Sequence, residues 1–473
     1  MRLGIGILAG ILLTLAGTPA GAQDVVAFTN VTVIPMDRER VLPDQTVLVR
    51  GGRIEAVGPA AGVRVPSGAR RVDGAGKYLV PGLADMHTHL LSDGAVPDSL
   101  APDELAVMLA NGVTTARLMV GTPEQLPLRA AVARGEVLGP TLFVASPQLA
   151  GRAYGEPWFN GRVVTTPEQA RAAVREVADA GYDFVKLTIF ITPEVYEAVQ
   201  DEARRRGIRV IGHVDPQVGL ARALAAGQQI EHLDSYFEAV LADGAPMTGS
   251  VSNHLVYRPA AWESVDWLSD EKVDSVGRAT AAARVWSTPT LTFFKLAFGT
   301  GMTDEEIRAL PGYRLLPDSL RSSMNGGRAY YWANPPSAAR RARYVEVRNR
   351  LVRAIHGAGG RILAGSDSPE WYLLYGWTLH RELESLVEAG LSPWAALEAA
   401  TRNPAEWLGT LEESGTVEPG KRADLVLLDA DPLADIRNTQ RIAGVMRAGR
   451  WMDAAELARM IDTSAARLRA SLP

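Results

Sequence analysis

The stretch GLADMHTHL, residues 82–90, places His87 and His89 two positions apart at the end of an apolar run. The chain of 473 residues has seven histidines, so two of them lie within three positions. Side chains two positions apart in a strand point the same way. Both imidazoles can therefore face one centre at the end of a strand, as metal ligands or as structural hydrogen-bonding groups. The pair alone does not decide between these two roles.

On either side of this pair, strand-like and helix-like segments alternate along the middle of the chain, which is typical of a parallel α/β fold. The predicted strands are residues 79–87, 113–119, 141–146, 183–188, 209–214, 228–233, 286–294 and 361–367. Helix-capping residues at Thr166 and Thr192 predict the starts of two helices, the second ending at Gly207. The pattern predicts a (β/α)8 TIM barrel with long insertions. An open doubly wound sheet is the alternative, but the chain lacks the glycine-rich phosphate-binding motifs typical of that fold.

The two ends of this region carry shorter strands and turns. VLVRGGRIEAVG (47–58) indicates a hairpin, and GTVEPGKRADLVLLD (415–429) and IAGVMRAGRWM (442–452) again indicate strands and turns. We therefore expect a small β-sandwich domain built from both ends of the chain. The expected boundaries are 23–78 and 410–455 for this domain, 79–409 for the barrel and 456–473 for a C-terminal helix.

The N-terminus resembles a secretory signal. Arg2 precedes a 14-residue apolar run that begins at Leu3, and small residues follow at 20–22. We expect residues 1–22 to be removed after Ala22 and the mature protein to be periplasmic or secreted. An uncleaved membrane anchor is the alternative, but a membrane span needs about 20 apolar residues.

The composition narrows the possible partners and metal ligands. The formal charge of −5 disfavours nucleic acid or an anionic membrane surface as a partner. The absence of cysteine excludes disulfides and thiolate metal sites, so any metal must be held by His, Asp, Glu or Lys. An exposed apolar face on an outer helix could support a homo-oligomer.

Four further polar residues interrupt or follow predicted strands that are otherwise apolar. They are Lys186 in DFVKLT, His213 in RVIGHV, His232 in QQIEHL and Asp367 at the end of RILAGSD. A buried lysine costs free energy unless it is paired, neutral or modified. Together with the histidine pair, these side chains are all expected at the carboxyl ends of the strands, where barrel enzymes place their active sites.

This order of residues, HxH, Lys, His, His and Asp, resembles the amidohydrolase superfamily with a dinuclear metal centre. PGLADMHTHL, GVTTARLM and SGTVEPGKRADLVLLDADP are similar to motifs of the superfamily. GYDFVKL, IGHV, IEHLD, STPTL, AGSDS and LVEAGLSPWAALEAATRNPAEWLG are similar to its imidazolonepropionase-like and prolidase-like (Xaa-Pro dipeptidase-like) branch. The resemblance covers nearly the whole mature chain.

The resemblance implies two divalent metal ions, for which zinc suits the ligands best. His87, His89 and Asp367 would bind one ion and His213 and His232 the other. Lys186 would bridge both ions after carbon dioxide converts it to N6-carboxylysine. A hydroxide bridging the ions would attack the carbonyl of a small amide or peptide substrate, a dipeptide or an N-acyl amino acid. Asp367 would act as general base and then as general acid.

Three other interpretations remain open. The same centre could hydrolyse a cyclic amide, a lactone or a phosphoester. A mononuclear deaminase of the superfamily is disfavoured, because such enzymes lack the bridging lysine and carry a glutamate three residues after the fifth-strand histidine. Here Pro216 stands three residues after His213. A non-catalytic metal-binding barrel is the alternative outside the enzymes.

Two residues are weaker candidates for contacts with the substrate. Tyr236 lies four residues past His232, and its hydroxyl is expected to reach a scissile carbonyl or a substrate carboxylate. His380 follows the eighth predicted strand by a short interval. The long, turn-rich insertion at 296–337 is a candidate lid.

Overall fold

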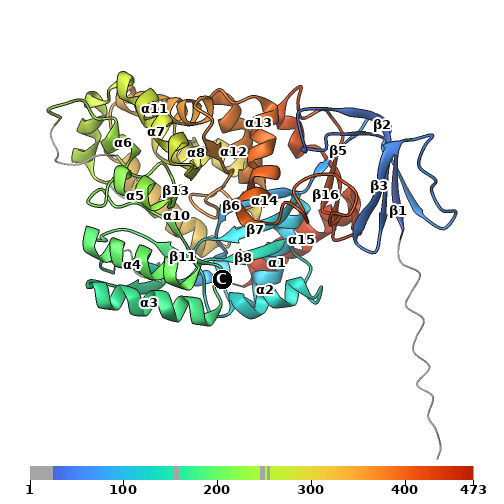
Figure 1. Cartoon of the computed structure of the whole chain (residues 1–473), viewed down its shortest axis with the longest axis horizontal. Coiled ribbons are helices and arrows are strands. Elements are labelled where there is room, and N and C mark those ends of the chain that lie inside the picture. Colours follow the sequence, from blue (N-terminus) through green and yellow to red (C-terminus); the bar gives the residue numbers. More distant parts are fainter. Residues whose placement is uncertain (1–24, 154–158, 246–250, 253–255, 472–473) are drawn as a thin grey trace, which may run out of the picture.

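The computed structural model describes residues 25–153, 159–245, 251–252 and 256–471. Figure 1 shows a large α/β body beside a smaller β-sheet that contains both early and late parts of the chain. The predicted signal segment, residues 1–22, lies outside the described residues. No helix in the described ranges has both the length and the apolar composition needed to cross a bilayer.

The large body contains the predicted parallel strands. In chain order they are β6 (Leu83–Thr88), β7 (Val113–Leu118), β8 (Thr141–Val144), β11 (Phe184–Leu187), β12 (Arg209–Gly212), β13 (Gln229–Glu231), β14 (Trp286–Thr288) and β15 (Arg361–Ile362). Two short strands, β9 (Gln148–Ala150) and β10 (Gly161–Val163), extend the edge next to β11. The parallel ladders are interrupted between β8 and β11 and between β15 and β6.

Single parallel bridges connect the strands across both interruptions. Ala145 pairs with Phe184, and Thr88 pairs with Ser368. The backbone N–H of Met86 also donates to the carbonyl of Ala364 at 2.9 Å. The strands therefore follow one another around a common core in the order that a TIM barrel requires. The α/β barrel predicted from the sequence is confirmed.

Helices alternate with these strands. They are α1 (Ala101–Ala110), α2 (Gln125–Ala133), α3 (Pro167–Ala180), α4 (Pro193–Arg206), α5 (Leu220–Ala226), α6 (Tyr236–Ala239), α7 (Asp270–Ala282), α8 (Leu291–Phe294), α9 (Asp304–Ala309), α10 (Asp318–Trp332), α11 (Ala338–Gly357), α12 (Trp377–Glu388), α13 (Pro393–Ala399) and α14 (Arg402–Leu408). Most of them pack on the outside of the barrel, whereas α8 and α10 contribute side chains to the cavity at its mouth. The side chains of Thr166 and Thr192 cap α3 and α4 as predicted, and Gly207 ends α4 in a left-handed conformation. Figure 1 shows α3 and α4 side by side along one side of the barrel.

The small domain is one mixed sheet that curls around its own core. Its strands are β1 (Val26–Val33), β2 (Leu42–Arg50), β3 (Arg53–Pro59), β4 (Arg70–Asp73), β5 (Tyr78–Pro81), β16 (Leu425–Leu428), β17 (Ile442–Arg447) and β18 (Arg450–Asp453). Although β1 and β18 are not neighbours in the sheet, the rings of Phe28 and Trp451 lie 5.0 Å apart. The N–H of Ile54 in β3 donates to the carbonyl of Lys421 just before β16. The curled sheet thus forms the sandwich-like core expected from the two chain ends.

Two predicted strands are wrong in detail. Residues 79–87 form two strands in two sheets, because the chain leaves the small domain after β5 and enters the barrel at β6. Gly82 makes this change of sheet possible, since a Cβ there would meet Oγ1 of Thr114 at 2.1 Å. Residues 286–294 are a strand only over β14, and α8 begins at Leu291. The insertion at 296–337 contains α9 and α10 rather than an irregular loop.

The C-terminal helix α15 (Ala454–Ala470) returns to the barrel. The side chain of Asp453 caps it by accepting from the N–H of Glu456. Arg467 forms an ion pair with Asp103 of α1 at 3.3 Å. This helix therefore ties the end of the chain to the barrel, close to the predicted 456–473. The expected homo-oligomer stays a prediction.

Candidate metal centre and substrate cavity

A cavity of 660 Å³ opens at the carboxyl ends of the barrel strands. All six predicted ligand-type residues line it, and we call this set the cavity floor: His87, His89, Lys186, His213, His232 and Asp367. They come from five different strand ends, so the barrel brings together residues that are far apart in sequence. The volume lies in the range typical of small-molecule sites.

One half of the floor is formed by β6 and the segment after β15. Nε2 of His87 and Nε2 of His89 lie 3.2 and 3.4 Å from Oδ1 of Asp367. The backbone N–H of Asp367 donates to the carbonyl of His87 at 2.7 Å, which joins the two segments. Asp367 has a φ of 54°, a strained backbone conformation for a residue with a side chain. The fold therefore holds this carboxylate between the two imidazoles despite a conformational cost.

The other half comes from β11, β12 and β13. The rings of His213 and His232 stack with centroids 4.8 Å apart, and the ring of His232 lies 4.5 Å from that of His87. Nδ1 of His232 is 3.6 Å from Oδ2 of Asp367. Lys186 is a residue of β11 and is only 1% exposed. The two halves thus share Asp367 and form one cluster.

Burial controls the protonation of this cluster. Burial lowers the pKa of His213 and that of His232 well below the usual histidine range, so both imidazoles are neutral near pH 7. Burial also lowers the pKa of Lys186 to about 8, against the opposing effect of Glu231 and Asp367. For Asp367, burial alone would raise the pKa, but His87 and His232 hold it well below its usual range. For His87, burial alone would lower the pKa, but Asp367 and Glu231 raise it above its usual range. The floor therefore offers the neutral imidazoles of His213 and His232 beside one ionised carboxylate.

A buried ion pair behind the floor orients His87. Arg117 donates to Oε1 of Glu231 at 2.6 Å, and Oε2 of Glu231 lies 2.7 Å from Nδ1 of His87. Burial alone would raise the pKa of Glu231, but Arg117 and His87 lower it to about 2. An ionised carboxylate can only accept, so His87 carries its proton on Nδ1. Its Nε2, 3.2 Å from Oδ1 of Asp367, is then the nitrogen that would face a metal ion, as second-layer carboxylates arrange in metal sites.

A second carboxylate does the same for His213. Oδ2 of Asp234 accepts from Nδ1 of His213 at 2.8 Å and from the backbone N–H of Val214 at 3.3 Å. The Nε2 atom of His213 is thereby left as the lone-pair nitrogen. Nδ1 of His232 lies 2.7 Å from Oγ1 of Thr290. Each of these floor histidines thus has a protein partner that settles its orientation.

The donor set fits divalent metal ions. His87, His232 and Asp367 each offer one ligand atom, and these atoms lie within 4.8 Å of one another. Across the described residues, no hydrogen bond or ion pair engages Nζ of Lys186, although this amine is buried. A buried amine without a partner is costly unless it is neutral or modified. Neutral imidazoles, a carboxylate and such a lysine are the oxygen and nitrogen ligands that suit zinc and its neighbours.

A model of the amidohydrolase family matches residues 78–452. The chain belongs to the amidohydrolase family. Members of this family depend on metal ions, in agreement with the cluster of His87, His232 and Asp367. The family predicted from the sequence motifs is therefore confirmed.

Solved structures of other amidohydrolases share the fold. A putative prolidase from Bifidobacterium longum is 27% identical with a TM-score of 0.66, and the match covers 94% of this chain and 99% of that one. A bottromycin amidohydrolase is 24% identical with a TM-score of 0.73, covering 94% of this chain and 90% of that one. These matches extend over both the barrel and the small domain.

The matches to curated relatives cover a smaller share of each relative than the matches to solved structures do. Adenine deaminase 3 of Rhizobium meliloti is 23% identical over 403 residues, which are 82% of this chain and 52% of the relative. An imidazolonepropionase of Cupriavidus taiwanensis is 28% identical over 260 residues, which are 44% of this chain and 62% of the relative. The chain spans about half the length of the adenine deaminases that it matches.

The structure corrects the two residues predicted to contact substrate. Tyr236 is fully buried outside the cavity, and its hydroxyl lies 3.0 Å from Oγ1 of Thr280 and 3.5 Å from Oγ of Ser287. His380 is buried in α12, with its ring nitrogens 3.0 Å from Oγ1 of Thr439 and from the carbonyl of Asn111. Neither side chain lines the cavity of this amidohydrolase. Both are structural hydrogen-bonding groups.

The second-layer carboxylates are functional candidates that are missing from the predicted site residues. Glu231 and Asp234 flank His232 in the sequence IEHLD, and this grouping of acids around a strand-end histidine was the available signal. Asp85 accepts from the N–H and the hydroxyl of Ser366 at 3.0 and 2.6 Å. It thereby anchors the segment that carries Asp367.

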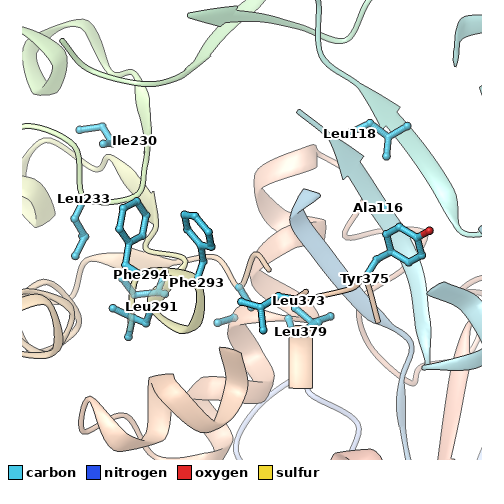
Figure 2. Close-up of a cluster of buried hydrophobic side chains, with 14 of the residues drawn as sticks. Ala116, Leu118, Ile230, Leu233, Leu291, Phe293, Phe294, Leu373, Tyr375 and Leu379 are labelled. Carbon is cyan, nitrogen blue, oxygen red and sulfur yellow. The ribbon is translucent and has the colours of Figure 1, made fainter. Parts of the chain in front are cut away.

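Aromatic residues cover one side of the cavity above His232. We call this set the aromatic wall: Phe293, Phe294 and Phe298. The ring of Phe294 lies 5.5 Å from that of His232, and the ring of Phe293 lies 5.0 Å from that of Phe294. Figure 2 shows Phe293 and Phe294 close together beside Leu291. Tyr257 contacts Phe298 edge to face at 5.0 Å and extends the wall toward solvent.

Proposed function

We propose that this protein is a metal-dependent hydrolase that cleaves an amide C–N bond of a small substrate. The observation that carries the proposal is the cavity floor itself, six ligand-type side chains at the base of one small-molecule cavity. Neutral histidines and a buried lysine without a partner are expensive in a binding pocket that holds no metal. A non-catalytic barrel would have little reason to retain them.

We propose that the donor set binds two divalent ions. We propose that His87, His89 and Asp367 hold one, that His213 and His232 hold the other, and that zinc occupies both. When bound, such ions polarise a carbonyl and lower the pKa of a water molecule enough to make it a nucleophile near neutral pH. Glu231 and Asp234 support this assignment because each leaves a histidine Nε2 available.

We propose that Lys186 is carboxylated at Nζ. The amine attacks the carbon of carbon dioxide and loses one proton to solvent, which leaves a carbamate anion. Its pKa of about 8 supports this step, because a substantial fraction of the amine is neutral and nucleophilic at pH 7–8. The carbamate would also supply negative charge between two cations.

In hydrolysis, the oxygen of water bonds to the carbonyl carbon, the C–N bond breaks, and the nitrogen leaves with a proton. Asp367 is the residue placed to move that proton, since it lies between both halves of the floor. Its carboxylate accepts the proton from the attacking water and then donates it to the departing nitrogen. The aromatic wall excludes water from one side of the reacting group.

The resemblance to prolidase-like enzymes suggests a dipeptide or an N-acyl amino acid as substrate. The adenine deaminase relatives suggest a second candidate, release of ammonia from an aminopurine, which is also hydrolysis of a C–N bond. The cavity of 660 Å³ has room for either class. Dipeptides, aminoacyl amides, N-acyl amino acids and adenine therefore belong in the first substrate panel.

We further propose that residues 1–22 direct export and are cleaved after Ala22, which leaves a periplasmic or secreted enzyme. The apolar run and the small residues at 20–22 support this proposal. Sequencing the N-terminus of the protein recovered outside the cytoplasm checks it. An intact Met1 in that fraction would contradict it.

The decisive experiment is native mass and metal analysis of the mature protein expressed with bicarbonate and zinc, beside Lys186→Ala. We expect about two metal ions per chain and a mass gain of one carbon dioxide, with the mass gain lost in the variant. The loaded wild type should hydrolyse at least one member of the panel. One metal ion without carboxylation would instead favour the deaminase, and bound metal without turnover of any member of the panel would leave the non-catalytic metal-binding barrel.

A further inference from the structure

The charges around the cavity are unusual for a site that should hold a dipeptide or an N-acyl amino acid. Among the described residues that line it, Lys186 is the single lysine or arginine. The internal segments outside the described ranges, 154–158, 246–250 and 253–255, contain neither residue type. A free carboxylate on the substrate would ordinarily meet the fork of an arginine. The described lining of this cavity offers none.

Two arginines near the cavity are engaged elsewhere. Arg348 is buried behind the floor, where it donates to the carbonyls of His232 and Pro289 at 2.9 and 2.8 Å. The guanidinium of Arg152 lies 3.8 Å from the ring centroid of Phe190. Neither side chain lines the cavity. Binding a substrate carboxylate through either one would require existing contacts to break.

The cavity does contain acidic groups beyond the floor. Asp93 accepts from the N–H of Leu90 at 3.1 Å and from the side-chain amide of Gln125, so both of its oxygens are engaged. Glu370 is different. Only its backbone is paired, with Leu373, and no hydrogen bond or ion pair joins its carboxylate to any described residue. Glu370 is thus an unpaired carboxylate facing the cavity, as far as the described residues extend.

Glu370 lies in the same strand-end segment as Asp367, the residue proposed to move the proton during hydrolysis. It follows Asp367 by three residues, and its side chain is exposed to the cavity although protein surrounds it. Low-polarity surroundings and the charge of Asp367 raise the pKa of Glu370 to about 8. The free enzyme therefore holds this group mostly protonated at pH 7, and a bound cation would supply the missing positive charge and favour the ionised carboxylate. The α-ammonium of an aminoacyl group lies two bonds from the carbonyl carbon that would be attacked.

We propose that the substrate is an aminoacyl amide with a free amino group, and that Glu370 determines this specificity by binding the substrate ammonium. The aromatic wall, with Leu320 and Val256 nearby in the lining, takes an apolar or aromatic side chain on the same aminoacyl group. The leaving amine carries no free carboxylate. This inference rests on the proposed amide hydrolysis and narrows it: N-acyl amino acids and dipeptides with a free C-terminus are poor substrates.

Three matched substrates test the proposal on the zinc-loaded enzyme. L-Phenylalanine p-nitroanilide has the ammonium, N-acetyl-L-phenylalanine p-nitroanilide lacks it, and L-phenylalanyl-4-aminobenzoate adds a carboxylate to the leaving group. We expect kcat/KM for the first to exceed those for the other two by roughly 10-fold or more, the size of one charge-assisted hydrogen bond. A higher kcat/KM for the carboxylate-bearing or the acetylated substrate would overturn the proposal.

Glu370→Gln then assigns the preference to one residue. The preference for the free amine over the acetylated substrate should fall to about one, mainly through a higher KM, and Glu370→Asp should restore part of it. Glu412→Gln, which changes an exposed carboxylate outside the cavity, is the matched control and should keep the preference. A preference that survives in Glu370→Gln overturns the proposal, as does loss of bound zinc from that variant.

A binding measurement separates this inference from the proposed function. Calorimetric titration with L-phenylalaninol and N-acetyl-L-phenylalaninol needs no turnover. We expect the free amine to bind roughly 10-fold more tightly to the wild type and about equally to Glu370→Gln. If no substrate is hydrolysed but this difference appears, amide hydrolysis fails while the ammonium site stands. If hydrolysis occurs but the difference is absent, the ammonium site fails.

Discussion

His232 and His380 are both almost fully buried, yet they lie in regions of opposite character. His232 belongs to the cavity floor, where it lies beside His87, His213 and Asp367. His380 lies in α12 beside the end of α1, and its two ring nitrogens contact Oγ1 of Thr439 and the carbonyl of Asn111. Burial therefore does not distinguish a candidate metal ligand from a structural histidine. The distinguishing feature is whether lone pairs remain directed toward a cavity.

The same contrast applies to charge. The floor concentrates a buried amine, an ionised carboxylate and the neutral imidazoles of His213 and His232, and the desolvation of these polar groups costs stability. The structural site of His380 differs, because burial keeps its imidazole neutral and its ring contacts a hydroxyl and a carbonyl. We therefore expect changes to the floor to affect activity much more than stability, and changes around His380 to do the reverse.

Lys186→Met gives the largest expected effect and tests the first half of this contrast. Removal of the side chain that we propose to bridge the metal ions should lower kcat/KM by roughly 10³-fold or more, as expected for loss of a group required for metal-assisted catalysis. The metal-free variant should be as stable as wild type or more stable by about 1–3 kcal/mol, because an unpaired buried amine is gone. Kinetics and urea unfolding of both proteins measure the two effects. A variant that retains activity, or that unfolds more easily than wild type, would contradict the expected difference between the cavity floor and the site of His380.

The pH dependence of stability tests the second half. Burial lowers the pKa of His380 to about 4, against about 6.5 in the unfolded chain. Above pH 6.5 the residue is neutral in both states. As the pH falls, the unfolded chain takes up the proton first, so the unfolding free energy drops until the folded protein also titrates near pH 4. The total loss attributable to His380 is about 3 kcal/mol.

His380→Gln lacks this titration, so the stability difference between wild type and variant should shrink by about 3 kcal/mol between pH 7 and pH 4. Urea unfolding of the metal-free proteins across this range provides the measurement. His356→Gln, at an exposed position near the end of α11, is the matched control and should follow the wild type. A wild-type-to-variant difference that is constant with pH would show that His380 is accessible to protons in the folded protein.

The sequence was sufficient to predict the order of the barrel strands and the residues of the floor, although the seventh predicted strand ends at Thr288 rather than at residue 294. The period of apolar residues located the barrel strands, and single polar residues at their ends identified Lys186, His213, His232 and Asp367. This prediction succeeded because a polar side chain at the carboxyl end of a buried parallel strand is surrounded by protein except on the side of the cavity. The long-range contacts between the two halves of the floor followed from barrel topology alone.

The residues beyond the strand ends could not be placed in the same way. His232, Leu233 and Ser235 all have positive φ angles near 60°, although none is glycine. These turns direct Tyr236 back into the core rather than into the cavity, and spacing from His232 gives no sign of them. Likewise, nothing local at Gly82 reveals that the chain changes sheets there. Such features depend on tertiary contacts rather than on sequence period.

Glu231→Gln tests whether the carboxylate behind the cavity floor orients His87. The amide would no longer hold the proton on Nδ1 of His87 as firmly and would leave Arg117 without its charged partner. We expect a roughly 10- to 100-fold loss of zinc affinity, the usual effect of removing a second-layer carboxylate, with kcat largely recovered at saturating zinc. Competition with a chromophoric chelator measures the affinity. Unchanged affinity would mean that the backbone alone orients His87.

Tyr236→Phe gives the smallest expected effect and tests the structural region at a residue that lies only four positions from a floor histidine. The hydroxyl contacts Thr280 and Ser287 and not the cavity, so its loss should lower the unfolding free energy by about 0.5–1.5 kcal/mol. Both kinetic constants of the zinc-loaded enzyme, kcat and KM, should stay within about twofold of wild type, since no substrate contact is removed. Thr280 also donates to the carbonyl of Val276, so it keeps one partner in the variant and the cost stays small. If turnover instead slowed by roughly an order of magnitude without a loss of stability, this hydroxyl would belong at the reacting bond rather than in the structural region.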